Sequence, residues 1–203
     1  MSVRSRKGMP IMIRTLALAA LVFLNMLTAA RAFPYVFDPD HTDITFTVNH
    51  LGFSTIHGRF RKYDMQIDLD PDNIEAAQVV VTIDASSLDT NSRLRDDHTM
   101  NYPGLLDVVR FPTITFRSTE IVLTSAETVR MTGDLTIRDV TRPVSFDVRL
   151  NARGVTPLSQ GKEVLGFTAT GKIDRVAFGM SFAAPAVSAI IPVRIDVEIT
   201  RAE

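Results

Sequence analysis

Residues 40–60, DHTDITFTVNHLGFSTIHGRF, contain the pattern that decides the fold. Ile44, Phe46 and Val48 alternate with polar residues, which is the period of two expected for a strand with one buried face. The alternation stops at residues 49–53, where a glycine favours a turn, and the strand pattern then resumes. The stretch therefore predicts two antiparallel strands whose apolar face meets either other side chains or a bound molecule.

Residues 1–32 have the features of a secretory signal peptide. Basic residues precede an apolar run from Leu16 to Leu27, and the small-residue sequence Ala30-Arg31-Ala32 follows it. The run is about a dozen residues long, whereas a membrane span needs about 18 or more. We therefore expect cleavage after Ala32 and export of a mature domain, residues 33–203, that has no permanent membrane span.

The composition of the expected mature chain excludes several classes of protein. Removal of residues 1–32 lowers the number of Lys and Arg from 22 to 17, against 23 Asp and Glu, which gives a formal net charge of −6. An acidic chain binds nucleic acid poorly, so we expect no nucleic-acid partner. Cysteine is absent, which excludes disulfides and thiolate metal sites. The remaining length suits one domain whose stability comes from packing.

Most of the remaining chain also has the alternation of strands. The segments are residues 33–37, 63–69, 79–83, 111–116, 129–137, 144–150, 165–173 and 191–199. Residues 138–143 are expected to form a turn, and residues 151–162 and 175–188 are expected to form loops. Residues 89–102 are charged and lack alternation, which predicts a short helix through about Met100, capped by Thr90, Asn91 or Ser92.

About eight long strands in series favour an all-β fold in which an antiparallel sheet closes on itself, because closure removes exposed edges. A sandwich of two sheets is the alternative. An eight-stranded barrel is just wide enough to be filled by side chains or to hold one ligand. The strand count therefore leaves open whether the interior is solid or hollow.

Five segments carry a resemblance to a known family: residues 38–60, 81–98 (VTIDASSLDTNSRLRDDH), 111–119 (FPTITFRST), 133–148 (GDLTIRDVTRPVSFDV) and 174–180 (DRVAFGM). In this order and spacing they resemble the YceI-like family of lipocalin-like polyisoprenoid-binding proteins. The resemblance covers nearly all of residues 33–203. The chain departs from the family pattern after His98, where residues 99–106 read TMNYPGLL.

The resemblance implies an extended eight-stranded antiparallel lipocalin-like β-barrel with one short helix closing an end. It also implies a non-catalytic periplasmic or secreted carrier, whose partner is an apolar lipid held inside the barrel. The implied ligand is a long apolar chain of the isoprenoid, isoprenoid quinone or fatty amide type. No cofactor is expected beyond such a bound isoprenoid lipid or isoprenoid quinone.

Apolar residues of the strand segments, with Phe178 of the loop over residues 175–188, are the candidates for the lining of this channel: Phe46, Val48, Phe60, Phe116, Leu135, Ile137, Phe167 and Phe178. Alternation alone favours the interpretation that these side chains fill a core. The resemblance instead implies that the set as a whole lines a hollow channel. A bulge near Gly52 or Gly58 would turn every later residue to the other face.

Three polar residues, His50, Arg95 and His98, are candidates for the mouth of the barrel, because a ligand pocket pairs apolar walls with a few polar groups. In the alternative, Arg95, Asp96 and His98 form an ion-paired anchor for the helix. His50 shares a face with Phe46 and also fits a core histidine that is satisfied by a backbone carbonyl.

Neither metal binding nor catalysis has a local sequence signal. The four histidines, which include a surface or turn residue His41, show no His-x-His or His-x3-His spacing. No Gly-x-Ser-x-Gly elbow is present. We therefore expect neither a metal site nor catalytic residues. The alternatives are a structural or interaction protein with a filled core, or a hydrolase; a homodimer is a further partner to consider.

Overall fold

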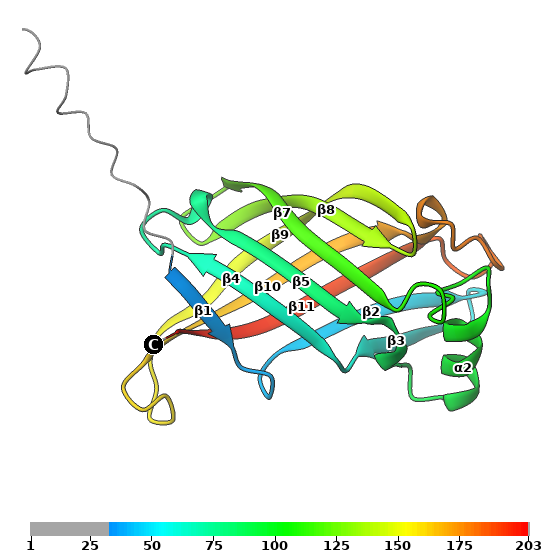
Figure 1. The fold of residues 1–203 in the computed structure, drawn as a ribbon, viewed down its shortest axis with the longest axis horizontal. Helices are drawn as coiled ribbons and strands as arrows, with labels where there is room; N and C mark the ends of the chain where they lie inside the picture. Colours follow the sequence, from blue (N-terminus) through cyan, green and yellow to red (C-terminus); the bar gives the residue numbers. More distant parts are fainter. Residues whose placement is uncertain (1–32, 203) are drawn as a thin grey trace, which may run out of the picture. The chain divides into compact units, whose positions relative to one another are not determined.

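Eleven β-strands form one antiparallel sheet in the computed structural model, which describes residues 33–202 (Figure 1). Residues 1–32, on which the signal-peptide interpretation rests, and Glu203 lie outside the described residues. Within the described range, no helix combines the length and the apolar character needed to cross a bilayer.

The strands follow the alternating segments of the sequence closely. They are β1 (Phe33–Phe37), β2 (Asp43–His50), β3 (Ser54–Phe60), β4 (Tyr63–Leu69), β5 (Gln78–Asp84), β6 (Leu88–Asp89), β7 (Thr113–Leu123), β8 (Thr128–Ile137), β9 (Val140–Val155), β10 (Glu163–Asp174) and β11 (Ile190–Arg201). The helices are α2 (Arg93–Asn101) and the 3₁₀ turns η2 (Ile74–Ala76), η3 (Ala85–Ser87) and η4 (Arg175–Phe178). Ser92 occupies the N-cap position of α2, within the expected range, but its side chain makes no capping hydrogen bond.

The sheet closes through β1. This strand pairs with β11 on one side and with β4 on the other, and the ring continues through β5, β7, β8, β9 and β10 back to β11. Eight strands therefore form a closed antiparallel barrel, as expected, and the two-sheet sandwich is excluded. Closure leaves β2, β3 and β6 as an extension of the sheet beside β11.

The first two strands share β11 as a partner. β1 pairs with its residues 199–201, and β2 pairs with its residues 193–196. The turn at residues 49–53 then joins β2 to β3, and both Leu51 (φ 57°) and Gly52 (φ 78°) have left-handed backbone conformations. Positive φ at both central residues is what a type I′ turn requires, and the N–H of Phe53 closes this turn by donating to the carbonyl of His50 at 3.0 Å. The turn predicted from residues 49–53 is confirmed.

Two bulges change the phase of the alternation, and neither lies near Gly52 or Gly58. The register shifts leave Thr119 in β7 and Asn151 in β9 without a direct partner, because each bulge puts two residues opposite one. The predicted loop over residues 151–162 is therefore too long, since β9 continues past the bulge to Val155. The turn predicted over residues 138–143 is also shorter, because β9 begins at Val140.

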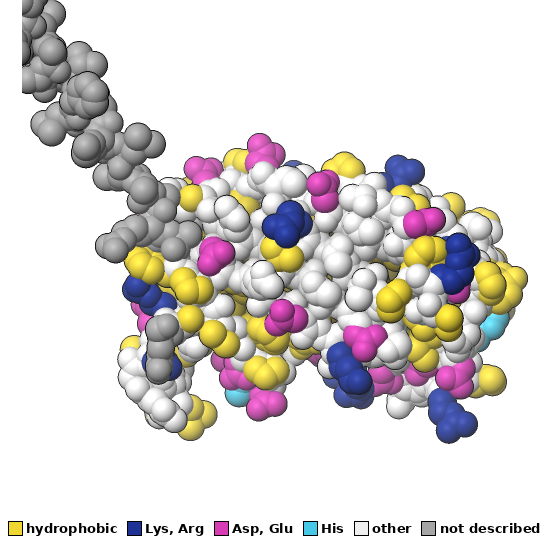
Figure 2. Space-filling model, in the orientation of Figure 1, with side chains coloured by type: hydrophobic (Ala, Val, Ile, Leu, Met, Phe, Trp, Pro, Cys, Tyr) yellow, Lys and Arg dark blue, Asp and Glu magenta, His cyan; other side chains and the backbone are white. Residues whose placement is uncertain are grey.

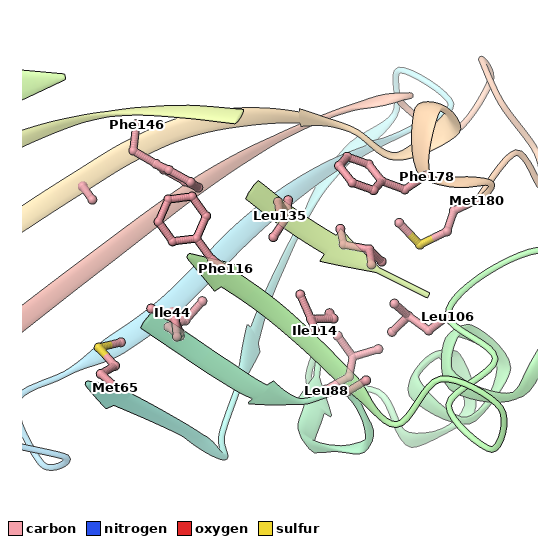
Figure 3. Packing of buried hydrophobic residues seen from close by; sticks show 14 residues of the cluster. Ile44, Met65, Leu88, Leu106, Ile114, Phe116, Leu135, Phe146, Phe178 and Met180 are labelled. Carbon is pink, nitrogen blue, oxygen red and sulfur yellow. The ribbon is translucent and has the colours of Figure 1, made fainter. Parts of the chain in front are cut away.

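The interior residues form one main cluster along the barrel, and Figure 3 shows the rings of Phe116 on β7 and Phe146 on β9, the two strands that flank β8, in contact within it. Their ring centroids lie 5.5 Å apart at an interplanar angle of 89°. Leu106 and Met180 lie at the α2 end of the same cluster. A smaller cluster around Tyr35 and Leu165 lies toward the opposite end. The apolar face predicted for residues 40–60 thus points into the barrel.

Candidate functional site

An apolar cavity of about 1020 Å³ occupies the barrel interior. This volume is at the upper end of the range of small-molecule sites, about 300–1,000 Å³. Its lining runs from Leu106 and Met180 at the α2 end to Asp72 and Glu127, which belong to turns at the other end. The interior is therefore hollow along the barrel, which argues against the filled-core alternative.

Seven of the eight predicted lining residues face this cavity. They are Phe46, Val48, Phe60, Phe116, Leu135, Ile137 and Phe167. Phe178 does not line it; its side chain is 2% exposed and packs in the main cluster from η4. The prediction failed for Phe178 because the predicted loop forms the 3₁₀ turn η4 there, which packs the ring into the main cluster instead of presenting it to the cavity.

Glycines opposite the interior phenylalanines keep the cavity open. A Cβ atom on Gly58 would lie 2.3 Å from the Phe46 ring, and one on Gly171 would lie 2.7 Å from the Phe146 ring. Both pairs are cross-strand neighbours, so each ring lies against the backbone of the facing strand. The rings therefore cover the barrel wall and leave the space along the axis free.

None of the three residues predicted for a polar mouth lines the cavity. His50 is exposed and forms an isolated bridge with Val187. His98 is exposed on α2, where its ring stacks on Tyr102 at a centroid distance of 5.2 Å. The alternative of a buried core histidine at His50 is also wrong, because the last residues of β2 extend beyond the part of the strand that pairs with β11.

Arg95 belongs to an anchor that holds the start of α2. Its Nε donates to the hydroxyl of Thr90 at 2.7 Å, and the hydroxyl and backbone N–H of Thr90 both donate to Oδ1 of Asp96. Asp96 is only 8% exposed, so these bonds satisfy a buried carboxylate. The anchor expected as the alternative reading is present, but it is hydrogen-bonded through Thr90, and His98 takes no part.

Most of the polar lining of the cavity lies at the end of the barrel opposite to α2. This part consists of Asp72, Asn73, Glu75, Thr124, Ser125, Glu127, Thr128 and Arg153, whereas Thr45, Thr99 and Arg175 line the cavity elsewhere. Arg153 is bound by Glu163, with Nε 2.8 Å from Oε1. That hydrogen bond raises the pKa of Arg153, and the charge of Asp72 raises it further. The mouth of the cavity is therefore rich in carboxylates.

Arg175 closes the α2 end and was missed from the sequence. Its side chain lines the cavity, is 6% exposed, and donates to the carbonyls of Met180, Val187 and Ser188. Burial lowers the pKa of its guanidinium group. Because all three acceptors belong to one loop, Arg175 fixes the segment between η4 and β11 across the end of the barrel.

Three side chains with metal-ligand chemistry gather on the outer surface, away from the cavity lining. Ligand atoms of Asp38, His41 and Glu198 lie within 4.8 Å of one another. Asp38 already binds His41, with Oδ2 2.8 Å from Nδ1, which lowers the pKa of Asp38 and raises that of His41. Sequence spacing could not have found this group, because Glu198 comes from β11 at the far end of the chain.

Comparison with known sequences gives a consistent result. A family model described as the YceI-like domain matches residues 35–199. A UPF0312 protein of Vibrio cholerae is 36% identical over 167 residues, which are 81% of this chain and 87% of that protein. Protein YceI of Salmonella arizonae is 34% identical over 164 residues, which are 81% of this chain and 84% of that protein.

Solved structures agree with this result. The YCEI protein of Campylobacter jejuni is 30% identical with a TM-score of 0.69, and the match covers 76% of this chain and 90% of that chain. A polyisoprenoid binding domain from Saccharophagus degradans shares the fold alone, at 10% identity, a TM-score of 0.60 and coverage of 84% and 99%. The closed barrel, its single α-helix among the described residues and these matches together show that the chain belongs to the YceI-like family.

Proposed function

We propose that this protein is a non-catalytic periplasmic carrier that holds a long apolar chain of the isoprenoid, isoprenoid quinone or fatty amide type inside its barrel. The observation that carries the proposal is the apolar cavity of about 1020 Å³ along the barrel. The name of the Saccharophagus degradans domain supports the ligand class. The signal-peptide features of residues 1–32 support the location.

The energetics suit a carrier of apolar chains. Transfer of a methylene group from water to an apolar site is worth about 0.8 kcal/mol, so ten groups give about 8 kcal/mol before the costs of association. Micromolar affinity corresponds to about 8 kcal/mol net, so a ligand must bury more than ten such groups to offset the costs of association, which a long apolar chain does. Two charged side chains, Arg175 and Asp96, are buried near the cavity. Their burial does not require a catalytic role, because both are hydrogen-bonded to neighbouring parts of the chain.

The test first identifies the bound apolar compound and then blocks the cavity that holds it. We expect organic extraction and mass spectrometry of freshly purified protein to yield an apolar compound near one per protein. The substitution Val48→Trp should abolish binding of an isoprenoid probe, because Val48 faces the cavity. Thr47→Trp is the matched control, since Thr47 directly precedes Val48 on β2 and does not line this cavity. A protein that is repeatedly empty and binds no probe would overturn the proposal.

A further inference from the structure

Exposed apolar side chains form a strip across the α2 end of the barrel. We define this end strip as Leu51, Phe53, Leu94, Tyr102 and Phe182. Phe53 and Leu94 are 88% and 83% exposed, and the other three are between 39% and 49% exposed. Figure 2 shows hydrophobic side chains at the surface of the barrel end where Figure 1 places α2.

The members of the end strip are connected. On α2, Leu94, His98 and Tyr102 are spaced four residues apart, which puts them on one side of the helix. The ring of Tyr102 lies 4.5 Å from that of Phe182. From there the loop reaches the β2–β3 turn, because Leu51 N–H donates to the carbonyl of Ala186 at 3.0 Å. Three segments that are distant in the sequence thus present one apolar surface.

The backbone conformation of Leu51 indicates that exposing this apolar side chain costs conformational free energy. Its φ of 57° is a left-handed conformation, which Asn, Asp and Gly adopt far more readily than leucine. The side chain is 49% exposed, so it gains little from packing against the barrel. A leucine that is both strained and exposed points to a function at this surface.

Only one layer of chain separates the end strip from the cavity. In the segment after α2, Tyr102 points to the strip whereas Leu105 and Leu106 line the cavity. In the facing loop, Phe182 belongs to the strip whereas Met180 lines the cavity. The two segments are joined by a long hydrogen bond, from Phe182 N–H to the carbonyl of Gly104 at 3.4 Å.

Charge gives the barrel an orientation relative to a lipid surface. Beside the end strip, α2 carries exposed charges of both signs at Arg93 and Asp97, whereas three carboxylates, Asp72, Glu75 and Glu127, line the mouth at the opposite end. A bilayer with anionic lipids repels carboxylates, so the mouth is the unfavourable end for contact. Large exposed apolar side chains such as Phe53 and Leu94 gain by insertion between lipids.

We propose that the end strip docks on a phospholipid bilayer, and that the apolar chain passes between bilayer and cavity at the Gly104–Phe182 contact. The passage rests on the carrier function proposed above, whereas docking does not. Docking would place the single layer of chain that covers the cavity against the hydrocarbon core of the bilayer. An apolar chain would leave or enter the bilayer at that point. The chain then avoids water during transfer.

The first test measures docking with the compact unit Arg31–Glu203, which contains all paired strands. Co-sedimentation with phosphatidylcholine vesicles, with and without phosphatidylglycerol, should show binding that depends weakly on salt. Phe53→Ser with Leu94→Ser should weaken it by about tenfold or more, which corresponds to about 1.4 kcal/mol. Leu158→Ser is the matched control at the other end, because Leu158 is also 88% exposed, and it should bind as the wild type does.

Leu51→Asn separates docking from folding. Asparagine tolerates the left-handed backbone of this turn, so the variant should be at least as stable as the wild type, yet it should bind vesicles several-fold more weakly. Equal vesicle binding by all variants would overturn the proposal. So would a wild type that ignores vesicles but self-associates through the same residues, since the end strip would then be an interface between copies.

The second test closes the proposed passage. An ideal Cβ on Gly104 lies 3.4 Å from Cβ of Phe182, close to the 3.5–4.5 Å usual in disulfides, and the chain has no native cysteine. In the double variant Gly104→Cys, Phe182→Cys, oxidation should slow transfer of a fluorescent isoprenoid from vesicles at least about tenfold relative to the reduced form. Equal rates would place the passage elsewhere. Vesicle docking without uptake of any apolar chain would refute the carrier function and leave docking intact.

Discussion

The two ends of the cavity are built in opposite ways. At the α2 end, Arg175 and Asp96 are buried and bonded to backbone groups of neighbouring segments. At the mouth, Asp72 and Glu127 are exposed residues of turns. Charged groups therefore hold the structure together at one end and determine the electrostatic potential at the other, although both sets line or border the same cavity.

This difference shows how burial decides the role of a charge. A buried charge is costly unless hydrogen bonds replace its water, so it is retained where it fixes a structure that apolar contacts alone would not fix. An exposed carboxylate costs little and acts on whatever approaches it. Substitutions at the α2 end should therefore change stability, whereas substitutions at the mouth should change the preference for the head group of a ligand.

The largest effect is expected at Arg175. Arg175→Ala removes the donors to three loop carbonyls and should lower the free energy of unfolding by about 3 kcal/mol. Arg142→Ala is the control, because Arg142 is exposed and donates to one carbonyl of the same region, that of Ala177. Urea denaturation measures both. Equal losses would show that burial does not distinguish the two arginines.

The anchor of α2 should give the next largest effect. Asp96→Ala leaves the N–H and hydroxyl of Thr90 without their acceptor, which should cost about 2 kcal/mol. The neighbouring Asp97 is exposed, so Asp97→Ala should change stability by less than about 0.5 kcal/mol. Hydrogen exchange at α2 amides is the local measurement, and an unchanged rate in the Asp96 variant would contradict the role of the anchor.

A smaller effect on stability is expected at the side wall of the cavity, where Phe46 packs against Gly58. Gly58→Ala should displace the Phe46 ring into the cavity, at a cost in stability of about 1 kcal/mol, and should weaken binding of an isoprenoid probe. Gly154→Ala is the matched control, because a Cβ there meets no atom within 4 Å. Unchanged probe affinity in the Gly58 variant would show that the ring does not set the width of the cavity.

The smallest effect is expected at the mouth. Asp72→Asn with Glu127→Gln should raise the affinity for a fatty acid about threefold, because two exposed carboxylates no longer repel the ligand carboxylate. Affinity for the corresponding fatty amide, and the free energy of unfolding, should stay unchanged. Competition binding with the two ligands measures the ratio. A ratio equal to that of the wild type would place the ligand head group away from this mouth.

Much of the fold and of the cavity wall could be predicted from the sequence. Seven of eight predicted lining residues face the cavity because the period of two is a local property of a strand, and the bulges at Thr119 and Asn151 do not reverse the phase at these positions. The position of the mouth was wrong for a different reason. His50, Arg95 and His98 were chosen by their polarity, without regard to which end of the barrel each turn occupies.

A signal for the mouth was nevertheless present. Successive antiparallel strands place their connections at alternate ends, so the turns after β4 and β7 share one end, and both contain carboxylates. Arg175 left no comparable signal. Its three acceptors lie 5 to 13 residues further along the chain, in a loop whose path nothing in the sequence specifies.

The sequence by itself determined the strands, the inward face of most of them and the apolar character of the interior, because these depend on neighbours two residues apart. Only the tertiary structure decided that the interior is hollow, that glycines hold the phenylalanine rings against the wall, and which end is closed. Those properties depend on contacts between distant segments, where differences of a few ångströms separate a filled core from a cavity.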